Sequence, residues 1–314
     1  MRAAYASSIH ADDPLAGLTV GDAPEPVLEG EDWATVTVRT SSLNHHDLWS
    51  LRGVGLPAER LPMILGCDAA GVDEDGNEVV VFPVVNDPAD PRGYSMLSER
   101  LQGSLAERLA VPRANLVPKP PEVSFVDAAC LPTAWLTAYR MLRAKGRVDD
   151  GESVLVQGAG GGVATAAVVL AVGLGKRVYA TSRDPEKRER IAALGATALE
   201  PGGRLPERVD VVIETVGAAT FEHSLKAAKP GARVVVSGST SGHLATVDLR
   251  RIFALQLEIL GSSMGTPEEL HELLKLVASG VHPIVDKVFP FSDVRGAFER
   301  LHQGEVFGKI VIEL

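Results

Sequence analysis

Short apolar runs and stretches with helical spacing alternate along the last two thirds of the chain. Residues 154–156 form an apolar run that stops at Gly158, and after further glycines residues 163–170 (VATAAVVL) have the composition of a buried helix. Further strand-like runs without polar alternation occupy residues 177–182, 209–214, 232–237 and 257–261. Runs of this kind suit strands that are buried on both faces, so this part predicts an α/β fold with a doubly wound parallel sheet.

The first 118 residues have a different pattern. Residues 34–40 alternate between apolar and polar side chains, and turn-forming residues separate several such pieces. This pattern predicts a mostly antiparallel β domain, which ends near Pro118, Pro120 and Pro121. Residues 125–146 are predicted to be mostly helical. The last residues, 309–314, form a predicted strand that would return to the first domain.

Composition restricts the class of protein. The chain has 314 residues, 23% of them charged, and a formal net charge of −10, which disfavours general binding to nucleic acid or to an anionic membrane. No apolar stretch reaches the ~18 residues of a membrane span, and residues 1–5 resemble a first strand more than a signal peptide, so we expect a cytoplasmic protein. Two distant cysteines, Cys67 and Cys130, supply neither a disulfide framework nor a cysteine-rich zinc site.

The glycine-rich turn after residue 156 predicts a dinucleotide site. Glycines allow a pyrophosphate to approach the backbone, and the start of the following helix offers free N–H groups and a partial positive charge. In the fingerprint G-x-G-x-x-G/A, the marker positions fall on Ala159, Gly161 and Ala164, so alanine replaces the first glycine. The alternative interpretation is an ordinary strand-to-helix turn.

The tip of the next predicted strand indicates which dinucleotide is bound. An NAD enzyme favours an acidic residue here, whereas this chain has Ser182 and Arg183, with Lys187 one turn into the following helix. Asp184 suits the N-cap of that helix. Because guanidinium and ammonium groups favour a 2′-phosphate, we predict NADP(H). The alternative is that Arg183 is a solvated surface charge.

Several segments in a shared order resemble the medium-chain dehydrogenase/reductase superfamily. They are residues 43–53 (LNHHDLWSLRG), 62–71 (PMILGCDAAG), 136–139 (LTAY), 154–164 (VLVQGAGGGVA) and 307–311 (FGKIV). Residues 154–164 are similar to the quinone oxidoreductase branch. The resemblance implies a GroES-like substrate domain, residues 1–119 and 286–314, and a Rossmann-type domain, residues 120–285.

The departures from the family concern zinc. Zinc-dependent members carry a cysteine where Asn44 stands, a histidine where Cys67 stands, and a third ligand near Thr133. Catalytic zinc needs about three His, Cys or carboxylate ligands. His45, His46, Cys67 and Asp68 remain as candidates, but we expect no metal.

The resemblance, together with the departures, implies an NADPH-dependent reductase of quinones or activated C=C bonds. The alternatives are a zinc-free alcohol or carbonyl dehydrogenase and an NADPH-binding sensor without turnover; a homodimer is expected, through residues 257–261. As catalytic residues the resemblance implies Asn44, Asp47 and Thr137. As cofactor-binding residues it implies Thr133, Gly160, Gly161, Gly162, Val163, Ser182, Arg183, Lys187, Thr215, Val216, Gly217, Gly238, Ser239, Ser262, Ser263, Met264 and Lys309.

Overall fold

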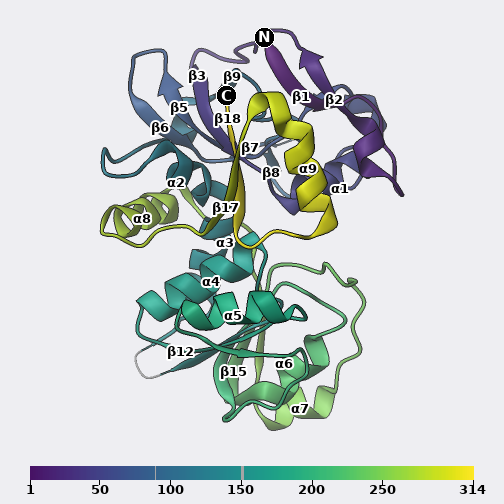
Figure 1. The fold of residues 1–314 in the computed structure, drawn as a ribbon, viewed down its shortest axis with the longest axis vertical. Helices are drawn as coiled ribbons and strands as arrows, with labels where there is room; N and C mark the ends of the chain where they lie inside the picture. Colours follow the sequence, from purple (N-terminus) through teal and green to yellow (C-terminus); the bar gives the residue numbers. More distant parts are fainter. Residues whose placement is uncertain (89, 150–151) are drawn as a thin grey trace. The chain divides into compact units, whose positions relative to one another are not determined.

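The computed structural model describes residues 1–88, 90–149 and 152–314. The chain forms two compact units (Figure 1). Unit 1 contains Met1–Thr133 and Thr266–Leu314, and unit 2 contains Ala134–Gly265. No helix in the described part of the chain is both long enough and apolar enough to cross a membrane.

Unit 2 is built on a six-stranded parallel sheet with the order β13-β12-β11-β14-β15-β16. Its strands are β11 (Ser153–Val156), β12 (Arg177–Thr181), β13 (Thr197–Leu199), β14 (Val209–Glu214), β15 (Ala228–Val236) and β16 (Glu258–Gly261). The strand order reverses between β11 and β14, and a sheet of this kind binds ligands beyond the carboxyl ends of its strands at that switch point. The predicted α/β class and doubly wound sheet are confirmed.

Helices connect the parallel strands of unit 2. They are α4 (Gly162–Gly173), α5 (Pro185–Ala193), α6 (Phe221–Ala227) and α7 (Leu249–Ala254), while α3 (Leu136–Arg140) precedes β11. α4 packs against β11 and β12, and α6 packs against β14 and β15. Asp184 caps α5, as predicted, by accepting hydrogen bonds from the N–H groups of Glu186 and Lys187.

Unit 1 is mostly antiparallel, as predicted. Its sheets have the orders β2-β1-β4, β10-β6-β5-β3-β18-β17 with β9 also paired to β3, and β7-β8. The strands are β1 (Arg2–Ala6), β2 (Leu18–Asp22), β3 (Trp33–Ser42), β4 (Met63–Ile64), β5 (Asp68–Asp73), β6 (Glu78–Val81), β7 (Val84–Asn86), β8 (Tyr94–Met96), β9 (Arg108–Pro112), β10 (Leu116–Pro118), β17 (Val285–Pro290) and β18 (Lys309–Glu313). β18 lies beside β3 (Figure 1), which confirms that the last strand returns to the first unit.

The helices of unit 1 cover its sheets. They are α1 (His45–Leu51), α2 (Phe125–Ala129), α8 (Pro267–Ala278) and α9 (Val294–Gln303). A buried apolar cluster joins α1 and α9 through Leu48, Leu51 and Phe298. The predicted helical stretch at residues 125–146 is confirmed, with π-helical turns at Leu131–Trp135 and Met141–Lys145 on either side of α3.

The limits of the compact units differ from the limits expected for the two domains, which were 119/120 and 285/286. Residues 120–133 belong to unit 1 because α2 packs on β3 and β5. Residues 266–285 belong to unit 1 because α8 packs on β10. Contacts of this kind between segments distant in sequence are not visible in a local pattern.

Candidate active site

The glycine turn lies at the switch point of the parallel sheet. Gly158, two positions after the end of β11, has φ +67°, and a β-carbon there would lie 2.3 Å from Cγ2 of Val216. Gly161 is the N-cap of α4, and Gly162 and Val163 open that helix. The first N–H groups of a helix have no partner within it, so they are available to an anion. The turn therefore has the conformation that the dinucleotide prediction requires.

The cationic side chain of Lys187 lies next to this turn. A β-carbon on Gly160 would lie 3.0 Å from Cδ and 3.8 Å from Nζ of Lys187, so the lysine side chain crosses the turn. Ser182 is buried at the end of β12, and Arg183 beside it is exposed. Since Oδ1 of Asp184 accepts from the first turn of α5, that carboxylate is occupied at the helix start.

Arg188, which the sequence analysis missed, holds the tip of β12. Its guanidinium donates to the carbonyl oxygens of Ser182, at 2.9 Å, and Arg183, at 3.1 Å. It also pairs with Glu200. The residue therefore fixes the loop that carries Ser182 and Arg183 and adds positive charge there. The signal in the sequence was a third basic residue one position after Lys187.

Glu214, at the end of β14, organises the next loop and was also missed. Its buried carboxylate accepts from the N–H groups of Val216, at 2.8 Å, and Gly217, at 3.1 Å. It also accepts from the hydroxyls of Thr220 and Ser224. A carboxylate buried with this many donors is compensated for the loss of water. A charged residue closing an apolar run was the signal for it.

The loops after β14 and β15 are tied together. The N–H and the hydroxyl of Ser241 both donate to the carbonyl oxygen of Val216. Gly217 is packed so tightly that a β-carbon there would lie 2.9 Å from the α-carbon of Ser239. The predicted residues Thr215, Val216, Gly217, Gly238 and Ser239 are thus brought together at one sheet edge.

Residues after β16 have features of a ligand site. Met264 has φ +48°, which is strained for a side chain of this kind, and its sulfur lies 4.0 Å from the hydroxyl of Thr137. The hydroxyl of Ser262 is buried without a hydrogen-bond partner in the described part of the chain, and so is that of Thr133 in unit 1. Such orphaned groups are rare and are expected where a bound polar group completes the site. Ser263 is exposed.

In unit 1, Asn44 is held by two charged residues. Its Oδ1 accepts from the ammonium of Lys309 at 2.7 Å, and its Nδ2 donates to Asp68 at 2.8 Å. Lys309 has its three N–H groups on protein acceptors, so as placed it has none left for a cofactor. Its contact with a cofactor stays a prediction.

Asp47 connects the two motifs of unit 1. Its carboxylate accepts from the N–H groups of Asn44 and Gly66, both at 2.8 Å. Burial raises its pKa, while His46 and these backbone donors act in the opposite direction. Asp47 therefore fixes the loop that carries Asn44.

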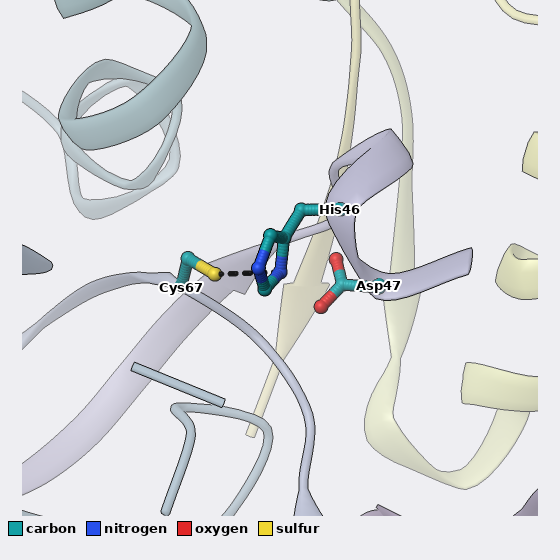
Figure 2. A group of neighbouring side chains, drawn as sticks. All are labelled: His46, Asp47 and Cys67. Carbon is teal, nitrogen blue, oxygen red and sulfur yellow. Dashed lines mark hydrogen bonds between the residues drawn. The ribbon is translucent and has the colours of Figure 1, made fainter. Parts of the chain in front are cut away.

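His46 lies between the thiol of Cys67 and the carboxylate of Glu99. One ring nitrogen lies 3.3 Å from Sγ of Cys67, a contact that Figure 2 shows. The other ring nitrogen lies 3.2 Å from Oε1 of Glu99. Burial alone would lower the pKa of His46, but Cys67, Glu99 and the charge of Asp47 outweigh it and raise this pKa well above its usual value. Burial raises the pKa of the Cys67 thiol. The raised pKa favours an imidazolium, whose two N–H groups lie within reach of Glu99 and of Sγ of Cys67.

His45 has a different environment. The pKa of His45 is lowered, first by partial loss of water around the ring and then by the charges of Lys309 and Arg52. At neutral pH the ring is therefore uncharged. It carries none of the cationic character of its neighbour, His46.

His46, Asp47 and Cys67 all carry donor atoms of kinds that bind metal ions. Their donor atoms all lie within 4.8 Å of one another. However, two of these groups are already engaged by other atoms: Nε2 of His46 lies 3.2 Å from Oε1 of Glu99, and Sγ of Cys67 lies 3.3 Å from the carbonyl oxygen of Leu97. Asp47 is fixed by two backbone N–H groups. As they stand, these three residues do not fit a catalytic zinc ion.

Two family models match the chain. "Alcohol dehydrogenase GroES-like domain" matches residues 30–121, and "Zinc-binding dehydrogenase" matches residues 189–312. Acryloyl-coenzyme A reductase of Sulfurisphaera tokodaii is 26% identical, over 96% of this chain and 97% of that protein. Crotonyl-CoA reductase of Streptomyces collinus is 27% identical, over 94% of this chain and 82% of that protein.

A solved structure is more similar still in sequence. The crystal structure of an NAD-dependent alcohol dehydrogenase is 33% identical, covers 100% of both chains and superposes with a TM-score of 0.90. The match extends over both units, and the two family models match one region on each side of the glycine turn. The chain is therefore an oxidoreductase that belongs to the medium-chain dehydrogenase/reductase superfamily.

Proposed function

We propose that this chain is an NADPH-dependent reductase that transfers hydride to an activated C=C bond or a quinone without zinc. The observation that carries the proposal is the arrangement around the glycine turn. Lys187 crosses the turn, Arg188 fixes the tip of β12, and Asp184 is occupied as a helix cap. The site thus offers cations to a ribose phosphate, and the carboxylate of Asp184 is already engaged by the helix start.

The residues of unit 2 have separate tasks in this proposal. Gly160, Gly161, Gly162 and Val163 bind the diphosphate, while Ser182, Arg183 and Lys187 bind the 2′-phosphate. The loops held by Glu214 bind the nicotinamide ribose. When bound, NADPH supplies the hydride; the protein orients it. We also propose that the nucleotide domain spans residues 120–285 of the chain.

Two of the three expected zinc-ligand positions carry weak ligands, which favours substrates that need no Lewis acid. Asn44 and Thr133 stand at expected ligand positions, and an amide and a hydroxyl are poor zinc ligands. A carbon–carbon double bond next to a carbonyl accepts hydride without a metal, provided that a donor stabilises the developing oxyanion. Asn44 and Thr137 are the proposed donors, and Asp47 positions Asn44.

The names of two relatives support the same class of substrate, compounds with an activated C=C bond. Both are reductases of acryloyl- and crotonyl-coenzyme A, whose acyl groups carry a double bond next to a thioester carbonyl. We therefore include enoyl thioesters with enones and quinones. The similarity to an NAD-dependent alcohol dehydrogenase favours a second candidate, a zinc-free alcohol or carbonyl dehydrogenase. A cofactor-binding sensor without turnover is the third.

We also propose a homodimer. β16 is at the edge of the six-stranded sheet, and Phe253 in α7 and Ile259 in β16 are 71% and 40% exposed. An unpaired strand edge next to apolar side chains suits pairing with a second copy of the same strand.

The experiment is a steady-state assay of the chelator-treated protein. NADPH oxidation is measured with an enone, an enoyl thioester, a quinone and an aldehyde, and NADP⁺ reduction with primary and secondary alcohols. We expect turnover with at least one of the first three and much weaker turnover with the aldehyde and alcohols. If the protein prefers alcohols or aldehydes, it is the zinc-free alcohol or carbonyl dehydrogenase. If it binds NADPH but turns over none of these compounds, it is the cofactor-binding sensor.

A further inference from the structure

A buried glutamine lies between two of the loops at the switch point of the sheet in unit 2. Gln157 follows β11 directly, and its side chain is fully buried. Its amide reaches β12 on one side, where Oε1 lies 2.7 Å from the hydroxyl of Thr181. On the other side it reaches α6, where Nε2 lies 3.1 Å from the hydroxyl of Ser224. One side chain therefore connects the surroundings of the glycine turn to the helix beside Glu214.

The direction of these hydrogen bonds is fixed from the carboxylate end. Glu214 can only accept, so the hydroxyl of Ser224, 2.6 Å from its Oε2, donates to it. The oxygen of Ser224 is then left to accept, and the Gln157 amide presents Nε2 to it. The second N–H of this Nε2 is accepted by Nδ1 of His223 at 2.9 Å, since Nε2 of that ring donates to the carbonyl oxygen of Gly203.

The other end of this chain of hydrogen bonds is the glycine turn. With its nitrogen on Ser224, the amide presents Oε1 to Thr181, whose hydroxyl donates to it. The same hydroxyl accepts from the N–H of Gly158 at 3.1 Å. The carbonyl oxygen of Thr181 accepts from the N–H of Ala159 at 2.7 Å. The turn is thus bound to β12 at two successive residues and, through the amide, to α6.

A primary amide suits this position well. Its oxygen accepts from one hydroxyl and its nitrogen donates to two acceptors, so both N–H groups of Gln157 are used. An apolar side chain would leave the buried hydroxyl of Thr181 without its acceptor, and a buried polar group that loses its partner is costly. Buried hydrogen bonds that all run in one direction also strengthen one another. The chain from Gly158 to Glu214 therefore resists displacement of either end.

We propose that Gln157 is a positioning residue that holds the glycine turn and the loop after β14 at a fixed separation. The chain ends on the backbone of that second loop, because Glu214 also accepts from the N–H groups of Val216 and Gly217. A ligand that spans two loops binds tightly only where their separation matches its length. Gln157, being fully buried, acts through its hydroxyl partners. This inference rests on the proposed function, in which NADPH places its diphosphate on one loop and its nicotinamide ribose on the other.

Calorimetry with two ligands separates spacing from local damage. NADPH spans both loops, whereas adenosine 2′-phosphate 5′-diphosphate carries the diphosphate and lacks the nicotinamide ribose. We expect Gln157→Met, Thr181→Val and Ser224→Ala each to weaken NADPH binding about fivefold, the worth of one hydrogen bond, and to change binding of the shorter ligand by no more than about twofold. Equal losses for the two ligands, or a lower Tm with unchanged binding of both, would overturn the proposal.

Ser153→Ala is the matched control. Ser153 is also fully buried, and its hydroxyl donates at 2.9 Å to another carboxylate of β14, that of Asp210. It lies at the amino end of β11, away from the glycine turn. We expect this variant to lower Tm about as much as Ser224→Ala and to leave the binding of both ligands unchanged. A loss of NADPH binding equal to that in Ser224→Ala would contradict the special place of the Gln157 chain.

The double variant Thr181→Val/Ser224→Ala tests the connection itself, and it decides the proposal even where Gln157→Met does not fold. Breaking either end already releases the connection, so the double variant should weaken NADPH binding about fivefold, as each single variant does, and not by the product of the two effects. Multiplied effects would overturn the proposal while leaving NADPH as the cofactor. A wild type that binds neither ligand would instead refute the proposed cofactor site, and this inference with it.

Discussion

Val216 packs directly against Gly158, so that a β-carbon at position 158 would lie 2.3 Å from Cγ2 of Val216. This contact joins the glycine turn after β11 to the loop after β14, across the switch point of the sheet. We predict that Gly158→Ala destabilises the protein by about 2–4 kcal/mol, from strain at φ +67° and from overpacking, and weakens NADPH binding.

Gly175 provides the control for this prediction. It has φ +70°, and no atom lies within 4 Å of a β-carbon placed there. Gly175→Ala therefore tests backbone strain alone, and we expect it to lower the free energy of unfolding by about 1 kcal/mol or slightly more. Denaturant unfolding and calorimetric titration with NADPH measure both effects. Equal destabilisation by the two substitutions would show that the Val216 contact does not matter.

Glu214→Gln tests the loop that Glu214 holds. The amide can accept fewer hydrogen bonds and brings its own donors, so we expect a loss of about 1–3 kcal/mol in stability. KM for NADPH should rise more than kcat falls. The control is Asp210→Asn on the same strand, where the carboxylate binds Lys229 and Ser153 instead of a loop. If both variants change KM for NADPH equally, Glu214 has no special role in the cofactor site.

Cofactor preference depends on the tip of β12. We predict that Arg183→Ala and Lys187→Ala each weaken NADPH binding about tenfold, because each removes one charge-assisted contact of roughly 1.5 kcal/mol. NADH has no 2′-phosphate, so its binding should stay nearly unchanged. Arg177→Ala is the control, because Arg177 lies at the opposite end of β12 and pairs with Glu207. Calorimetry with both nucleotides measures the preference. Parallel losses for NADPH and NADH would contradict recognition of the 2′-phosphate.

His46 makes stability depend on pH. Its pKa is raised in the folded protein by Cys67, Glu99 and Asp47, against the opposing effect of burial. The protonated ring therefore stabilises the fold. This contribution is fully present below about pH 6.5, the usual value for histidine, and is lost as the pH rises through the raised value.

The measurement compares the wild type with His46→Gln. The difference in unfolding free energy between the two should shrink as the pH rises from 6 towards 9. In His46→Gln, the part of the pH dependence of the unfolding free energy that comes from His46 should be absent. A difference that stays constant or grows with pH would mean that His46 is not held as an imidazolium.

Assembly depends on the edge strand of unit 2. We predict that Ile259→Lys places a charge in the interface between two copies and converts the protein to monomers in light scattering. Val54→Lys is the control, since Val54 is exposed in unit 1. A wild-type protein that is monomeric at all concentrations would refute the predicted homodimer.

The sequence was sufficient for features that depend on local pattern. The apolar runs of β11 and β14 predicted the parallel sheet, and the Asp184-Pro185 pair predicted the start of α5. The glycines after β11 predicted the turn at the switch point, although alanine occupies the first marker position. These signals are short-range consequences of burial, capping and backbone freedom.

Contacts between distant segments were beyond the sequence pattern. Lys309 is 241 positions from Asp68 and 265 from Asn44, so nothing local indicated that its ammonium would be buried between them. Likewise, the pattern gave no reason to join Val216 to Gly158. The roles of the predicted cofactor and catalytic residues remain predictions, because they depend on a ligand.

The most direct test of zinc-free hydride transfer uses NADPH that carries deuterium at C4 of the nicotinamide ring. The chelator-treated protein is incubated with this cofactor and an enone or enoyl thioester, and the product is analysed by NMR. We expect deuterium on the β-carbon of the product, at full rate after removal of metals. Deuterium at the carbonyl carbon, or transfer that requires added zinc, would contradict the proposed function.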